Sequence, residues 1–204
     1  MFNSCSHKTE STSAFCDYIQ TKSNTTLSNE LKIFSELAKT KTGVYVLEDG
    51  NSSMISRAWL CENAEKSIDI QYFIFSTDNV GLIACDYLVR AADKGVKVRL
   101  VIDDILIDAK VEDVLSLSSH PNIEIKIYNP GVNLGKSIYS KVKKFVTDFR
   151  AANQRMHNKT FIVDGKVVIT GGRNIADEYF DYDHDYNFRD RDVLLIGKEG
   201  SSVT

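Results

Sequence analysis

The chain has 204 residues, a length that suits one domain or one large domain with a tail. Its hydrophobic fraction of 43% is ordinary for a soluble globular chain, and its net charge of -3 argues against a general nucleic-acid binder. No stretch approaches the length of a transmembrane helix, and the spacing of the 4 cysteines does not fit a metal site.

Apolar periodicity predicts helices and strands in alternation after a polar tail. Residues 1–24 are rich in Ser and Thr and form the expected tail, which leaves 25–204 as the folded domain. Helices are expected at 27–37, 52–65, 80–94 and 107–117. Strands are expected at 43–47, 67–75, 96–102, 123–128, 159–163, 166–170 and 192–196. This alternation predicts an α/β fold with a mixed, largely parallel β-sheet flanked by helices on both faces.

Three places along the chain have two interpretations each. Residues 136–151 combine an apolar helical face with lysines, which is typical either of a surface helix on the sheet or of a basic helix that contacts anionic lipid. Asp103-Asp104 ends a strand, where it is either a ligand position or a helix cap. Of Gln71 and Tyr72, on a central strand, we expect one to face a functional site and the other the core.

The most informative stretch is a spaced set of polar residues and glycines: His157, Lys159, Asp164, Gly171, Gly172 and Asn174. Asp164-Gly165 predicts a two-residue hairpin loop in which Val163 pairs with Lys166, so that His157 faces Gly172. Because side chains alternate along a strand, His157 and Lys159 share one face. The glycines opposite them are expected to leave room for a ligand.

These residue types suit phosphoryl chemistry. A neutral imidazole such as that of His157 can attack phosphorus and hold the phosphoryl group covalently. The Lys159 ammonium and the Asn174 amide would stabilise charge on the non-bridging oxygens, and a carboxylate could orient the imidazole ring. The alternative is that His157 and Lys159 are ordinary strand residues and Asp164 a turn residue. The whole spacing, H-x-K-x4-D-x6-G-G-x-N, favours function.

This spacing resembles the HKD motif of the phospholipase D superfamily. The stretches 155–159 and 171–180, together with 67–74, 91–104 and 121–124, resemble bacterial cardiolipin synthases. The resemblance covers about 43–197 and implies that His157 is the nucleophile and Asp164 the acidic member of the motif. It implies that the phosphate or substrate is bound by Lys159, Asn174, Gly172 and Arg155. No metal ion and no cofactor are implied.

One departure from the family pattern bears on function. Members of this type carry two HKD motifs that line one active site, and the second histidine serves as the acid for the leaving group. This sequence contains one H-x-K, and its other histidines, His7, His120 and His184, lack the spacing. A second motif is therefore expected from a homodimer partner or from a missing C-terminal half.

Three hypotheses follow from the sequence. The first is a phosphatidyltransferase or phosphodiesterase that acts on a phosphatidylglycerol-like lipid, peripheral at a bacterial membrane and touching it through 136–151. The second is a homodimeric, single-motif endonuclease, with nucleic acid as the partner. The third is an inactive N-terminal fragment of a two-motif enzyme.

Overall fold

A computed structural model describes residues 26–103, 116–130 and 155–197. The helices are α2 (Leu27–Glu30), the 3-10 helix η1 (Leu31–Phe34), α3 (Ser35–Ala38), α4 (Gly50–Asn63), α5 (Asn79–Asp93) and the 3-10 helix η3 (Asp177–Tyr179). The strands are β1 (Gly43–Leu47), β2 (Ser67–Tyr72), β3 (Lys97–Asp103), β4 (Ile123–Tyr128), β5 (Lys159–Val163), β6 (Val167–Gly171) and β7 (Asp192–Ile196). The predicted tail 1–24 and the segment 136–151 lie outside the described residues, and both stay predictions.

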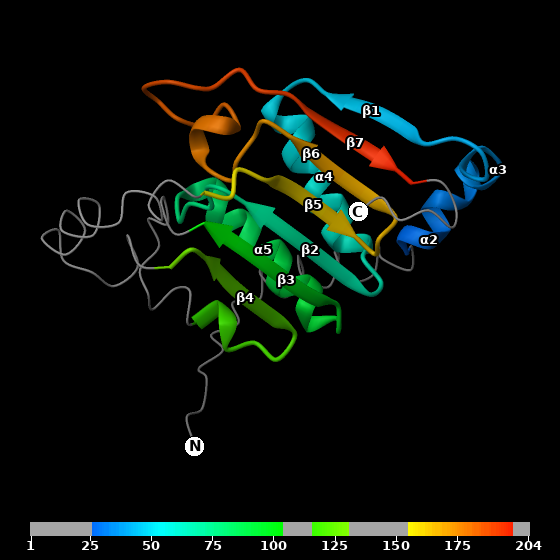
Figure 1. The fold of residues 1–204 in the computed structure, drawn as a ribbon, viewed down its shortest axis with the longest axis horizontal. Coiled ribbons are helices and arrows are strands. Elements are labelled where there is room, and N and C mark those ends of the chain that lie inside the picture. The colour runs from blue at the N-terminus through cyan, green and yellow to red at the C-terminus, as the bar shows by residue number, and fades with distance from the viewer. Residues whose placement is uncertain (1–25, 104–115, 131–154, 198–204) are drawn as a thin grey trace, which may run out of the picture.

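The strands form one sheet in the order β1-β7-β6-β5-β2-β3-β4 (Figure 1). The pairings β2–β3 and β3–β4 are parallel, whereas β2–β5, β5–β6, β6–β7 and β7–β1 are antiparallel. The predicted mixed α/β class is confirmed, but the expectation of a largely parallel sheet is wrong. A parallel neighbour needs a long crossover, which α5 supplies between β2 and β3, whereas short hairpin connections join β5 to β6 and reverse the chain.

Both long helices begin at aspartate caps. Asp49 accepts a hydrogen bond from the Ser52 N–H at 2.8 Å and starts α4, and Asp78 accepts one from the Gly81 N–H at 2.9 Å and starts α5. Helix α5 gives way to a turn at Gly95, which has a φ of 94° that glycine adopts without strain. The cap at Asp49 explains why α4 begins two residues before the predicted helix.

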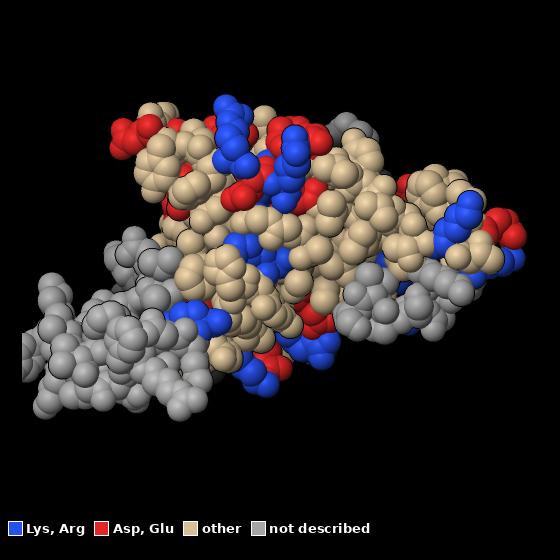
Figure 2. Space-filling model, turned by 45° about the horizontal axis from the view of Figure 1, so that its top comes forward, with Lys and Arg blue, Asp and Glu red and all other residues tan. Residues whose placement is uncertain are grey.

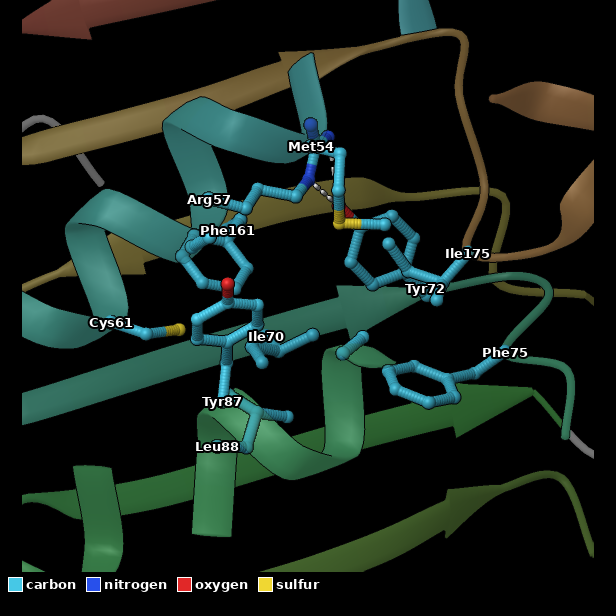
Figure 3. A pocket seen from close by; sticks show the side chains of 12 residues that line it. Met54, Arg57, Cys61, Ile70, Tyr72, Phe75, Tyr87, Leu88, Phe161 and Ile175 are labelled. Carbon is cyan, nitrogen blue, oxygen red and sulfur yellow. Dashed lines mark hydrogen bonds between the residues drawn. The ribbon is translucent and has the colours of Figure 1, made fainter. Parts of the chain in front are cut away.

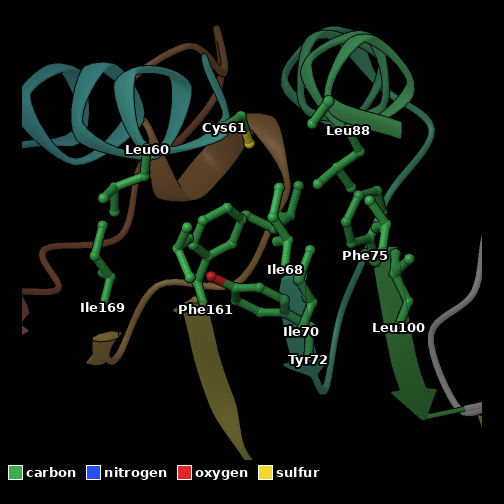
Figure 4. Close-up of a cluster of buried hydrophobic side chains, with 14 of the residues drawn as sticks. Leu60, Cys61, Ile68, Ile70, Tyr72, Phe75, Leu88, Leu100, Phe161 and Ile169 are labelled. Carbon is green, nitrogen blue, oxygen red and sulfur yellow. The ribbon is translucent and has the colours of Figure 1, made fainter. Parts of the chain in front are cut away.

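The hydrophobic core lies between the sheet and helices α4 and α5, which pack on the same face (Figure 4). Leu60 and Cys61 of α4 and Leu88 of α5 point toward Ile70 and Phe161 of the sheet. Within the described ranges both long helices cover this one face, so the expected covering of both faces is not met there. The opposite face of β2, β3 and β4 carries the ion pairs Arg99–Asp69 and Lys126–Glu124.

A small cavity remains inside this core, between α4, α5 and the sheet (Figure 3). Its volume is ≈ 20 Å³, about the space of one water molecule. The Nε and Nη2 atoms of Arg57 reach its wall and donate to the Tyr72 hydroxyl, each at 3.1 Å. The cavity is too small for a substrate.

Candidate active site

Most of the residues that the sequence singles out lie at one side of the sheet, where the strands end. The carboxyl ends of β2, β3 and β6 meet there with the amino end of β5 (Figure 1). His157, Lys159, Asn174 and Arg155 all lie at or beside these strand ends. Asp164 does not, because it follows the last residue of β5, at the opposite edge.

His157 and Lys159 contact one another, as the strand alternation predicts. The Lys159 Nζ lies 3.3 Å from the His157 Nε2 and donates to the His157 carbonyl oxygen at 3.2 Å. Lys159 is 7% exposed, and burial lowers the pKa of its ammonium below the ordinary 10.5, while the Asp190 carboxylate opposes that shift. The pair places the Lys159 ammonium directly beside a ring nitrogen of His157.

Phe73 is a member of the site that the sequence interpretation missed. Its ring lies 4.9 Å from the His157 ring, centroid to centroid, at an angle of 55°. The Lys159 Nζ lies 5.4 Å from the centroid of the same ring, within the range of a cation–π contact. The only signal was its place near the end of the predicted strand 67–75; β2 ends at Tyr72, so the alternation of side chains along a strand does not tell where Phe73 points.

Of the neighbours of Phe73 on β2, Tyr72 faces the core as predicted, whereas Gln71 points to the opposite face of the sheet. Tyr72 is fully buried and accepts hydrogen bonds from Arg57 inside the core. The Gln71 Oε1 accepts from the Asn158 Nδ2 at 2.8 Å, so Gln71 holds the residue between His157 and Lys159. Because Tyr72 pairs with Lys159 and Gln71 with Thr160, Gln71 lies on the face of the sheet opposite to the Lys159 side chain, so the expectation that it faces the functional site is not met.

Asn174 is 2% exposed and fixed by two partners. Its Oδ1 accepts from the Ile74 N–H at 3.0 Å, which ties it to the end of β2. Its side chain also hydrogen-bonds the Tyr179 hydroxyl; burial raises the pKa of Tyr179, and this bond partly offsets the shift. An amide nitrogen has two N–H donors, so Asn174 can serve Tyr179 and a phosphate oxygen together.

The hairpin register differs by one residue from the prediction. Val163 pairs with Val167 and Thr160 with Thr170, so the loop contains three residues rather than two. Asp164 and Gly165 both adopt positive φ, at 54° and 66°, and the predicted pairing of Val163 with Lys166 is wrong. Continuing the observed register places His157 opposite Arg173 and not opposite Gly172.

The glycines leave no room for a ligand, contrary to the expectation. A Cβ at Gly172 would overlap the Asp190 side chain, and a Cβ at Gly171 would overlap Asp192 and the Arg191 carbonyl. The Gly172 N–H donates to the Arg191 carbonyl oxygen at 3.1 Å, so that donor is already used. The absence of a side chain at Gly172 thus makes room for the Asp190 side chain. The sequence interpretation missed that Asp190 is a neighbour of Lys159.

Asp164 holds the fold together at the opposite edge. Its carboxylate accepts from the backbone N–H groups of Glu65, Lys66 and Ser67 at 2.9, 2.7 and 2.9 Å. These N–H groups lie at the first residue of β2 and just before it, so Asp164 fastens the hairpin to the neighbouring strand. The structure does not bring it together with His157.

Arg155 and Asp103 anchor the segment that enters the site. The Arg155 Nη1 lies 3.1 Å from the Asp103 Oδ1, and the Met156 N–H donates to the Asp103 Oδ2 at 2.9 Å. Asp103 is fully buried. Its carboxylate therefore positions the chain just before His157, a use that neither interpretation of Asp103 foresaw, while Asp104 lies outside the described residues.

A buried charged network supports the turn that carries Asn174. Asp192 is fully buried and accepts from the Ser53 hydroxyl at 2.6 Å and from the Arg57 Nη2 at 2.9 Å. Its other oxygen accepts from the Arg173 N–H at 3.3 Å. The Arg173 guanidinium donates to the carbonyls of Leu47 and Glu48 at 3.2 and 3.0 Å. Two arginines and one aspartate thus fix the turn between β6 and Asn174.

The face of the molecule drawn in Figure 2 carries both signs of charge. Figure 2 shows basic and acidic side chains side by side on the face it presents, rather than a patch of one sign. Among the described residues, no helix is long and apolar enough to cross a membrane. In the same ranges, no group of three or more His, Cys, Asp or Glu side chains could hold a metal ion.

Comparisons with known proteins show which family the chain resembles. Residues 60–198 match the family described as "Cardiolipin synthase, PLD-like domain". Cardiolipin synthase C of Escherichia coli is 40% identical over 157 residues, which are 76% of this chain and 32% of that protein. An uncharacterised protein of Helicobacter pylori strain 26695 is 42% identical over 158 residues, which are 78% of this chain and 31% of that protein. The chain thus spans about a third of the length of these relatives.

Two solved structures share the fold. NucT of Helicobacter pylori superposes with a TM-score of 0.55 at 17% identity, over 78% of this chain and 87% of NucT. The phosphatidylserine synthase of Haemophilus influenzae also gives a TM-score of 0.55 at 17% identity, over 84% of this chain and 38% of that enzyme. At this identity the likeness concerns the fold alone.

Proposed function

Because the chain belongs to the phospholipase D-like domain family of cardiolipin synthases, we propose that it transfers phosphatidyl groups through a phosphohistidine at His157. The donor is a phosphatidylglycerol-like phospholipid and the acceptor an alcohol or water. With phosphatidylglycerol as the acceptor, the product is cardiolipin. The observation that carries the proposal is the contact of Lys159 Nζ with His157 Nε2 at 3.3 Å, against the ring of Phe73.

The residues at the edge of the sheet support each step. The His157 Nε2 bonds to phosphorus while the bond from phosphorus to the headgroup oxygen breaks, and the headgroup leaves as an alcohol after it takes a proton. The acceptor hydroxyl then attacks phosphorus, the phosphorus–nitrogen bond breaks, and the acceptor proton passes to the base that the first step created. Lys159 and Asn174 stabilise the non-bridging oxygens in both steps. Arg155, anchored by Asp103, keeps His157 in place.

The proton for the leaving alcohol comes, in this proposal, from a second motif. Family members of this type place two histidines in one site, and this chain spans about a third of its relatives' length. Another copy of the chain, or further sequence in a longer protein, would supply the second histidine. Contact of residues 136–151 with anionic lipid belongs to the same proposal, and co-sedimentation with phosphatidylglycerol vesicles tests it.

The decisive experiment measures headgroup release from labelled phosphatidylglycerol vesicles by three proteins: the wild type, His157→Ala and His184→Ala. His184 is an exposed loop histidine and controls for the loss of an imidazole elsewhere. We expect release to be lost in His157→Ala and kept in His184→Ala, with the phosphatidyl group found on His157 after an alkaline quench. Release that continues in His157→Ala overturns the mechanism. Cleavage of single-stranded DNA without lipid turnover would make nucleic acid the substrate instead.

A further inference from the structure

Strand β1 is an exposed apolar edge. It pairs with β7 on one side and lies at the outer margin of the sheet in Figure 1, and no strand of the described residues pairs with its other side. Val44, Tyr45 and Val46 are 64%, 65% and 44% exposed. Because neighbouring side chains of a strand point to opposite faces, apolar surface is exposed on both faces of this edge.

No residue of β1 hinders this strand from pairing with a further strand. The strand Gly43–Leu47 contains no proline and no charged residue, the features that usually keep edge strands from pairing. The apolar surface continues into a groove of ≈ 340 Å³, which Phe34 and Leu37 line together with Val44 and Leu194. An edge of this kind is expected to be covered by a partner strand.

We propose that the partner is a second copy of this chain, paired antiparallel through β1 about a two-fold axis at Tyr45. A two-fold contact requires a surface that complements itself. The segment Val44-Tyr45-Val46 reads the same in both directions, so each Val44 lies opposite Val46 of the other copy. Each Tyr45 lies opposite its own counterpart, and such aromatic cross-strand pairs stabilise a sheet.

The charges that flank β1 favour the antiparallel arrangement. Lys41 precedes the strand, Glu48 and Asp49 follow it, and all three residues are exposed. Antiparallel pairing about Tyr45 places Lys41 of each copy opposite Asp49 of the other, so opposite charges meet at both ends. A parallel arrangement would bring lysine beside lysine and carboxylates beside carboxylates.

This dimer is independent of the proposed function. His157 lies at the same edge of the sheet as Leu47, the carboxyl end of β1. Antiparallel pairing of two β1 strands therefore sends the two His157 side chains to opposite ends of the joined sheet. The dimer does not supply the second motif, and its presence or absence says nothing about phosphatidyl transfer.

Sedimentation velocity over a concentration series tests the dimer, with the full chain as the wild type, Tyr45→Lys and Tyr182→Lys. Tyr182 is 57% exposed between η3 and β7, outside β1, and is the matched control. We expect a dimer for the wild type and Tyr182→Lys, and a dissociation constant more than about tenfold higher for Tyr45→Lys, since a central aromatic often dominates an interface. A wild type that stays monomeric, or a dimer that Tyr45→Lys leaves intact, overturns the proposal.

Two further variants test the register. Tyr45→Cys places two thiols opposite each other at the axis, so mild oxidation should give a covalent dimer above the wild-type background, whereas Tyr182→Cys should not. Lys41→Glu brings a glutamate opposite Asp49 and should weaken the dimer, less so at high salt. Oxidation that links Tyr182→Cys as readily as Tyr45→Cys, or a dimer that Lys41→Glu strengthens, contradicts the antiparallel pairing.

Discussion

Replacement of Asp164 separates a role in the reaction from a role in the fold. The three hydrogen bonds that its carboxylate accepts from backbone N–H groups contribute about 1 kcal/mol each to the net stability of the fold. Asp164→Ala loses all three bonds and places alanine at a φ of 54°, which costs about 1 kcal/mol more. The sum of about 4 kcal/mol corresponds to a fall of roughly 10 °C in Tm for a domain of this size.

Asp164→Asn is the matched variant because asparagine tolerates a positive φ and keeps one oxygen acceptor. The bonds to Lys66 and Ser67 share Oδ1, whereas the bond to Glu65 uses Oδ2. Asparagine therefore loses one bond of three, and we expect a fall of about 4 °C in Tm. Circular dichroism gives both midpoints, and calorimetric titration with inorganic phosphate well below them reports the site. Unchanged Tm values, or loss of phosphate binding in a stable variant, would refute this reasoning.

Three other substitutions probe the environment of Lys159. Since burial lowers the pKa of its ammonium, phosphate binding should fall as the pH rises through a value below 10.5, and Lys159→Arg should remove that fall because arginine keeps its charge. Calorimetric titration across the alkaline range checks this, and a pH-independent wild type would contradict it. Gly172→Ala displaces the Asp190 carboxylate that opposes the shift, so the fall should move to lower pH. Gly165→Ala, in open space at a φ of 66°, should lower Tm without moving the pH profile, and equal profiles for both variants would contradict the role of Asp190.

Most of the fold could be predicted from local patterns, and the errors arise where the order of strands matters. The predicted strands at 43–47, 123–128, 159–163 and 192–196 have the bounds that the structure gives. The mixed sheet was predicted correctly, but the share of parallel pairings was overestimated, because apolar periodicity says which residues form strands but not which strands become neighbours. The chain places β5 beside β2, and this pairing separates the parallel part of the sheet from the antiparallel part.

For the candidate site, the sequence predicted only the contact between residues of a single strand. The alternation of side chains was enough to place His157 beside Lys159. The environment of that pair depends on residues far away in sequence, such as Phe73 and Asp190, whose positions follow from tertiary packing. The hairpin register failed for a related reason, because Asp164 is held by the start of β2 and the loop takes in Lys166 as a third residue.

The place of the site follows from the change of direction within the sheet. In α/β sheets, ligands bind where the carboxyl ends of neighbouring strands diverge. Here β2 and β3 end at one edge, and β5 begins at the same edge in the opposite direction. Phe73 and Asp103 come from the ends of β2 and β3, whereas Arg155 and His157 come from the segment that leads into β5. Residues at the end of one strand therefore lie beside residues that precede another strand. This is why the Asp103 carboxylate at the end of β3 can anchor the residues just before His157.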